Sequence, residues 1–151
     1  MRQFTPPPIT TKNTLGEVRL DYAFQIELEL DERHTSRTAR GVRIYQGILG
    51  GEVRGPKFTG KVYTRGHGEY GLARSDGVVD LHTQIVLNVD GEWIFVRHHG
   101  YERPDGYARI AAYIDADLRG KHAELNNSVF IATGEPSADG RRIVFTYFEA
   151  A

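Results

Sequence analysis

The sequence predicts an all-β protein that folds as a single antiparallel β-barrel of about eight to nine strands. Short runs rich in Val, Ile, Tyr, Phe and Thr follow one another from residue 17 to the C-terminus. Glycines, 17 in all, and Asp-Gly pairs separate these runs, which is typical of turns between antiparallel strands. The length of 151 residues suits one domain with its own core. Closure into a barrel would leave no exposed sheet edge.

The elements are expected in a simple order along the chain. Residues 1–16 include three consecutive prolines and few apolar side chains, so we expect a flexible N-terminal arm before a barrel domain at 17–151. The expected strands are 17–30, 41–49, 52–63, 67–74, 78–89, 92–100, 127–134 and 141–149. Segment 107–125 is ambiguous, because its Ala, Leu, Arg and Lys residues favour a helix while YARIAAYI at its start can extend as a strand. A short helix or lid at one mouth of the barrel is one interpretation of it.

The composition excludes several classes of function. A formal net charge of −1 gives no overall field that would attract nucleic acid or an anionic membrane, so neither is expected as a partner. The absence of cysteine removes disulfides, thiolate zinc sites and cysteine nucleophiles. No apolar stretch has the length of a signal peptide or of a bilayer span of about 18 residues. We therefore expect a soluble cytoplasmic protein.

Two Asp-Gly turns set the expected pairing of the central strands. NVDGEW at 88–93 predicts a two-residue hairpin loop, which pairs Val89 with Glu92 and His82 with His99. RSDGVV at 74–79 contains a second Asp-Gly. If this loop also has two residues, Glu69 lies opposite Gln84 and Gly71 lies opposite His82.

Alternation along these strands divides the side chains into two faces. One face is largely apolar and holds Leu81, Thr83, Ile85, Leu87, Ile94, Val96 and His98. The other is polar and aromatic and holds Asp80, His82, Gln84, Val86, Asn88, Trp93, Phe95, Arg97 and His99. This polar face could be a solvated outer surface. It could also line a pocket, since it has no lysine, carries two large aromatic residues, and has the small residues Gly71 and Ala73 beside it.

Four segments resemble a known family. GGEVRGPKFTGKV at 50–62, LARSDGVVDLHTQIVL at 72–87, WIFVRHHG at 93–100 and ELNNSVFIATGE at 124–135 are similar to domain of unknown function 3237, also called uncharacterised protein family 0311. The resemblance implies a small antiparallel β-barrel of the calycin or allene-oxide-cyclase-like kind, cytoplasmic and without a required metal or cofactor. Departures from the family pattern, such as His82 and Gln84, fall on the polar face, which favours variable pocket chemistry on a common scaffold. We therefore predict that the polar face lines the barrel lumen, and that the outward apolar face is covered in a homo-oligomer.

The expected function is proton transfer without a cofactor on a small aromatic or carbonyl-containing metabolite, as in an isomerase, cyclase or lyase. Histidines beside carboxylates can be tuned to exchange protons near neutral pH. The predicted catalytic residues are His82, His99, Asp80 and Glu69, and the predicted substrate-binding residues are Arg97, Gln84, Trp93, Phe95, Tyr22, Gly71 and Asn126. His82, His99 and a carboxylate could imitate a metal site, but adjacent histidines on a strand point to opposite faces, and no metal is expected. The alternative function is a non-catalytic, lipocalin-like small-molecule binding protein. A third interpretation is an interaction module whose polar face is solvated.

Overall fold

The computed structural model describes residues 18–65 and 67–151, and the arm predicted at 1–16 lies outside these residues. The described chain folds into nine strands and one short 3-10 helix. Their bounds are β1 (Leu20–Thr38), β2 (Gly41–Arg54), β3 (Thr59–Val62), β4 (Gly68–Ala73), β5 (Val79–Val89), β6 (Glu92–Glu102), β7 (Ala108–Ala116), η1 (Ala123–Asn127), β8 (Val129–Pro136) and β9 (Arg142–Ala150). No helix in these residues is long and apolar enough to cross a bilayer.

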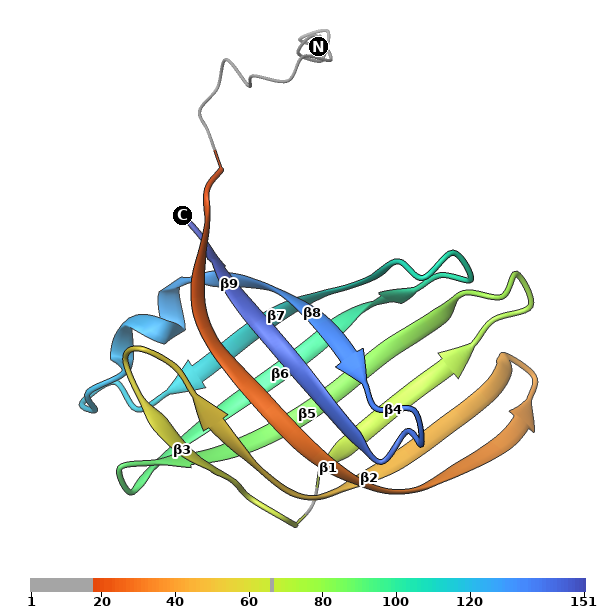
Figure 1. Ribbon diagram of the computed structural model, residues 1–151, viewed down its shortest axis with the longest axis horizontal. Coiled ribbons are helices and arrows are strands. Elements are labelled where there is room, and N and C mark those ends of the chain that lie inside the picture. The colour runs from red at the N-terminus through yellow and green to blue at the C-terminus, as the bar shows by residue number, and fades with distance from the viewer. Residues whose placement is uncertain (1–17, 66) are drawn as a thin grey trace, which may run out of the picture.

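The strands close into an antiparallel ring, which confirms the predicted all-β barrel (Figure 1). β1 pairs with both β9 and β2, and β9, β8, β7, β6 and β5 follow as successive neighbours around the wall. β3 and β4 share the remaining position, because each pairs with β2 on one side and with β5 on the other. The barrel thus closes without an unpaired edge along most of its wall.

Several predicted segments differ from the structure. β1 continues to Thr38, eight residues beyond the expected strand 17–30. The expected strands 41–49 and 52–63 are divided differently, since β2 continues through Gly51 to Arg54 and β3 is a separate short strand. Gly51 has φ 151°, and a Cβ there would stand 2.0 Å from the carbonyl oxygen of Glu27, so this position requires glycine. Segment 107–125 was ambiguous in the sequence, and in the structure it is mainly strand β7, followed by a turn and the start of the short 3-10 helix η1.

The apolar face of β5 and β6 points into the barrel. Ile85, Leu87, Ile94 and Val96 are each at most 1% exposed. They join apolar side chains from every strand except β4 in one core. The prediction that the polar face lines the lumen is therefore wrong: His82, Gln84, Arg97 and His99 lie on the outer surface.

Packing energetics explain this choice of face. Burying each large aliphatic side chain stabilises the fold by roughly 1.5–3 kcal/mol, while burying unpaired charged groups costs several kcal/mol each. A barrel of about eight strand positions has an interior that side chains can fill, and here an aromatic cluster around Phe24 does so at one end. A homo-oligomer was expected because the apolar face would point outward and need cover. Since the apolar face lies inside the barrel, this reason no longer applies. The oligomer itself remains a prediction.

The two Asp-Gly turns adopt different loops. Asp90 and Gly91 both have positive φ, 54° and 81°, as a two-residue loop requires, and every pair predicted between β5 and β6 is present. In the other turn Arg74 and Val78 are hydrogen-bonded neighbours, and only Gly77 has a positive φ of 85°. The loop therefore has three residues, and the pairing of β4 with β5 is shifted by one position.

This shift moves a carboxylate from one side of the wall to the other. Glu69 lies opposite Thr83, not opposite Gln84 as predicted. Thr83 is 3% exposed and faces the interior. Glu69 therefore turns into the barrel, while the histidines of β5 and β6 with which it was predicted to act remain outside.

Candidate functional site

A cavity of about 380 Å³ lies inside the barrel, near the turns that join β6 to β7 and β8 to β9. We call it the mouth cavity. Its walls are mostly apolar, with contributions from Leu28, Leu30, Leu81, Ala108, Ile110, Pro136, Ile143 and Phe145. Its polar lining residues are Arg33, Gln46, Glu69, Thr83 and Glu102. A mostly apolar cavity of this size with a few polar groups is typical of a small-molecule site.

Glu69 on β4 provides the carboxylate of the mouth cavity. Its Oε1 accepts a hydrogen bond of 2.9 Å from the backbone N–H of His82, and the Thr83 hydroxyl donates to its Oε2. Burial raises the pKa of Glu69, and these two hydrogen bonds oppose that rise. The nearby charges of Arg33 and Glu102 act on the same pKa, the first lowering it and the second raising it. Glu69 is therefore a carboxyl group held in place and easier to protonate than an exposed one.

Two further residues shape the surroundings of this carboxylate. Gly71 lies beside it, and a Cβ at that position would stand 3.4 Å from Oε1 of Glu69. Gln46 is 6% exposed, and its amide Nε2 donates to the carbonyl oxygens of Asp31 at 2.9 Å and Gly140 at 3.1 Å. These bonds fix the amide between β1 and the turn that precedes β9. Glu69 and Gln46 are thus each held in place by two hydrogen bonds.

A buried histidine and tyrosine form a second internal polar pair. His98 lies opposite Thr83 in the β5–β6 ladder and is 3% exposed. Its Nε2 shares a hydrogen bond with the hydroxyl of Tyr147 on β9, and its Nδ1 has no hydrogen-bond partner among the described residues. Burial lowers the pKa of His98 to about 3 and raises that of Tyr147 well above its usual value. Both side chains are therefore neutral at physiological pH.

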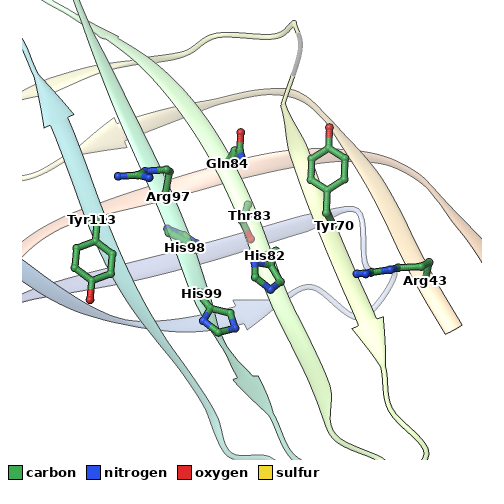
Figure 2. A pocket seen from close by; sticks show the side chains of 9 residues that line it. All are labelled: Arg43, Tyr70, His82, Thr83, Gln84, Arg97, His98, His99 and Tyr113. Atoms are coloured by element: carbon green, nitrogen blue, oxygen red, sulfur yellow. The ribbon is translucent and has the colours of Figure 1, made fainter. Parts of the chain in front are cut away.

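Four of the predicted site residues do meet, but on the outer surface. His82, Gln84, Arg97 and His99 line a concavity of about 540 Å³ on the outside of the barrel (Figure 2). We call it the outer concavity. Its remaining lining residues are Arg43, Tyr70, Thr83, His98 and Tyr113. The rings of His82 and His99 stack with their centroids 4.3 Å apart. Glu69, on the inner side of the same wall, is not part of this group.

The other predicted residues are dispersed. Asp80 forms an ion pair of 3.3 Å with Arg74. Trp93, Phe95 and Tyr22 are each about half exposed, at 48%, 47% and 48%, and belong to neither the mouth cavity nor the outer concavity.

Asn126 has a structural role in η1. Its Oδ1 accepts from the backbone N–H of Ala116 at 2.8 Å, and its Nδ2 donates to the carbonyl oxygens of Ala116 and Ala123 at 2.9 and 3.0 Å. These bonds join η1 to the end of β7. The prediction of Asn126 as a substrate-binding residue is not supported, because its amide is committed to the backbone.

The residues missed by the sequence analysis are Arg33, Gln46, Thr83 and Tyr147. Thr83 was assigned to the apolar face, and its polarity on that face was the available signal for an internal polar group. Gln46 and Tyr147 reach their partners only after the barrel has closed, so their separation in sequence hides them. No three His, Cys, Asp or Glu side chains of residues 18–65 and 67–151 are grouped as metal ligands would be.

Comparisons with known proteins support the fold and the family. The model of the family described as "Protein of unknown function (DUF3237)" matches residues 18–112. No curated protein matches the sequence. A protein of unknown function from Clostridium acetobutylicum has a similar structure, with a TM-score of 0.81 and 19% identity over 90% of this chain and 99% of that chain.

Two further structures extend this comparison. A protein from Acinetobacter baumannii described as β-barrel-like has a TM-score of 0.77 at 16% identity, covering 99% of this chain and 100% of that one. A protein from Penicillium herquei described as an enzyme has a TM-score of 0.73 at 19% identity, covering 95% of this chain and 100% of that one. At these identities the similarity establishes the barrel fold and no specific chemistry.

Proposed function

The chain belongs to the DUF3237 family, whose description assigns no reaction, and from its own residues we propose that it is a cofactor-independent acid–base enzyme. Its substrate would be a small carbonyl-containing compound bound in the mouth cavity, and the reaction an isomerisation, cyclisation or elimination begun by proton transfer to Glu69. The observation that carries this proposal is a carboxylate with a raised pKa on the wall of a mostly apolar cavity.

The environment of Glu69 suits a general base. A carboxylate is most effective in proton transfer when its pKa lies closer to the working pH than that of an exposed carboxyl group. Burial provides this shift, while the His82 N–H and the Thr83 hydroxyl keep the carboxylate in one orientation. Since β4 and β5 are paired strands of the barrel wall, the base is carried by rigid elements.

The lining of the cavity indicates the class of substrate. Apolar walls formed by residues such as Phe145 and Ile110 favour an aromatic or aliphatic body. Arg33 supplies a cation near Glu69 that could stabilise negative charge developing on a carbonyl oxygen. His82, His99 and Asp80 take no part in this proposal, because their side chains lie outside the cavity.

The same fold in a protein described as an enzyme is compatible with catalysis in this barrel. The second candidate function is a carrier that binds the same compounds without changing them. The mostly apolar lining of the mouth cavity favours binding under either function. The two functions therefore differ only in what Glu69 does.

The proposal is tested by hydrogen exchange at the carbon beside a carbonyl group. Phenylacetone and 2-tetralone are incubated with the protein in D₂O, and loss of the α-proton signal is followed by ¹H NMR. We expect catalysed exchange by the wild type, and at least a hundredfold slower exchange by Glu69→Gln with binding retained, consistent with removal of a general base. Glu135→Gln, which changes an exposed carboxylate of β8, should exchange at the wild-type rate.

Two results would contradict an enzyme of this kind. Binding of these ketones without catalysed exchange by the wild type would favour the carrier. Equal exchange rates in the wild type and Glu69→Gln would show that Glu69 is not the base.

A further inference from the structure

The outer concavity is separate from the mouth cavity and lies on the opposite face of β5 and β6. Its side chains come from five strands, β2, β4, β5, β6 and β7. Figure 2 shows Arg43 and Tyr70 on one flank, Arg97 and Tyr113 on the other, and the rings of His82 and His99 between them. The ladder partner of His99 on β7 is the small residue Ala111.

The outer concavity is cationic. Arg43 and Arg97 are both exposed and flank two histidines, and its lining within the described chain contains no Asp or Glu. Asp80, the acidic residue nearest to His82 in sequence, forms an ion pair with Arg74. Asp115 lies 3.6 Å from Arg97, and both side chains are 62% exposed, so solvent screens this pair strongly.

Two arginines on neighbouring strands share one acidic partner. Arg54 on β2 and Arg142 on β9 both lie 3.0 Å from the carboxylate of Glu27. Arg43 is on the same strand as Arg54 but has no ion-pair partner among residues 18–65 and 67–151. Within the described chain Arg43 is therefore a cation without an acidic partner, and Arg97 has only its solvent-screened contact with Asp115.

The outer concavity also offers flat surfaces. The imidazole rings of His82 and His99 are inclined by only 22°, and the half-exposed rings of Tyr70 and Tyr113 stand at its rim. Burial, the neighbouring His99 and Arg43 all lower the pKa of His82, while Asp80 raises it. A bound anion would act on this pKa in the same direction as Asp80 and would oppose the effects of His99 and Arg43. Flat rings and cations together suit a flat, negatively charged ligand.

We propose that the outer concavity is a second ligand site, which binds a small aromatic carboxylate with its ring on the His82–His99 pair and its carboxylate at Arg43 or Arg97. The Gln84 amide and the tyrosine hydroxyls can hydrogen-bond to polar substituents on the ring. This site is independent of the proposed reaction at Glu69, since the two ligands occupy opposite faces of the wall. It assigns a ligand-binding role to Arg97 and Gln84, two of the predicted substrate-binding residues.

The test is an NMR titration of the imidazole signals of the full chain at pH 7.5. The probes are 4-hydroxybenzoate, the neutral 4-hydroxybenzyl alcohol, and inorganic phosphate, each at up to 10 mM. We expect saturable shifts of the His82 and His99 signals with 4-hydroxybenzoate and at least tenfold weaker binding of the other two. The double variant Arg43→Gln/Arg97→Gln should weaken 4-hydroxybenzoate binding at least tenfold.

Arg54→Gln is the matched control, because it removes an outer-surface arginine of β2 that is not part of the concavity. It should bind 4-hydroxybenzoate as the wild type does, and so should Glu69→Gln. Equal binding of the alcohol would refute the role of the charge, and equal binding of phosphate would refute the role of the ring. Absence of saturable shifts, or unchanged affinity in the double variant, would overturn the site. A failure of the proposed reaction at Glu69 would leave these results unaffected.

Discussion

The buried imidazole of His98 predicts a specific sensitivity of the fold to acid. His98 is neutral in the folded barrel, since burial lowers its pKa from 6.5 to about 3. In the unfolded chain the same ring has its ordinary pKa and takes up a proton below about pH 6.5. Between these two values only the unfolded state binds the proton. The contribution of neutral His98 to stability is therefore present above pH 6.5 and is lost as the pH falls towards 3.

The size of this loss follows from proton linkage. Within the window, the free energy of unfolding falls by about 1.4 kcal/mol for each pH unit. The loss is therefore about 1.4 kcal/mol at pH 5.5 and about 2.7 kcal/mol at pH 4.5. Domains of this size are commonly stable by about 5–15 kcal/mol, so this one side chain should produce a readily measured effect.

The assay is urea denaturation at pH 7.5, 6.5, 5.5 and 4.5, comparing the wild type with His98→Gln. Glutamine does not titrate, and its amide can still bond to the Tyr147 hydroxyl. We expect the packing change in the variant to lower its free energy of unfolding by an amount that does not depend on pH. Between pH 7.5 and 4.5 the free energy of unfolding of the variant should fall by about 2.7 kcal/mol less than that of the wild type. His99→Gln, which changes the exposed neighbour, should keep most of the wild-type dependence on pH. Equal losses in the wild type and His98→Gln would refute the assignment of His98 as a buried neutral group.

Three further predictions test the packing of the barrel. Tyr147→Phe should lower the free energy of unfolding by about 1–3 kcal/mol in urea denaturation at pH 7.5, because it removes the hydrogen-bond partner of His98; no loss would contradict that bond. Gly100→Ala should prevent folding, since its Cβ would stand 2.1 Å from a carbonyl oxygen of β7. Gly91→Ala, with nothing within 4 Å, should cost only the left-handed strain of about 1–2 kcal/mol, and similar thermal midpoints for the two variants would refute this contrast. Asn126→Ala should destabilise the protein by about 1–3 kcal/mol, because three hydrogen bonds to backbone are lost, and should leave ketone binding unchanged; weakened binding in a folded variant would give Asn126 a ligand role.

The sequence was sufficient for the fold class and for the register of one hairpin. Asp90-Gly91 forms the two-residue loop that the dipeptide favours, and the pairs of β5 with β6 follow directly from it. The dipeptide Asp76-Gly77 instead belongs to a three-residue loop, in which only the glycine has a positive φ. Both loops are accessible to Asp-Gly. Local sequence alone could therefore not determine the position of Glu69.

The choice of face was predictable from burial energetics, and the wrong choice came from weaker evidence. Burying Ile85 and Leu87 provides a large favourable free energy, so their face should point into the barrel. The absence of lysine from the other face is a much weaker indication of which face is inside. The internal polar groups were harder to predict. Thr83 meets Glu69 only after the β4–β5 register is fixed, and His98 meets Tyr147 across strands that are far apart in sequence.

Strand β5 connects the two proposed sites while keeping them chemically separate. Thr83 points inward and donates its hydroxyl to Glu69, whereas His82 points outward and stacks on His99. The one direct link is the backbone N–H of His82, which donates to Oε1 of Glu69. Because the strand ladder fixes this N–H, replacing the His82 side chain should leave the hydrogen bond in place. Side chains on the two faces can therefore be changed independently, and each proposal can fail without the other.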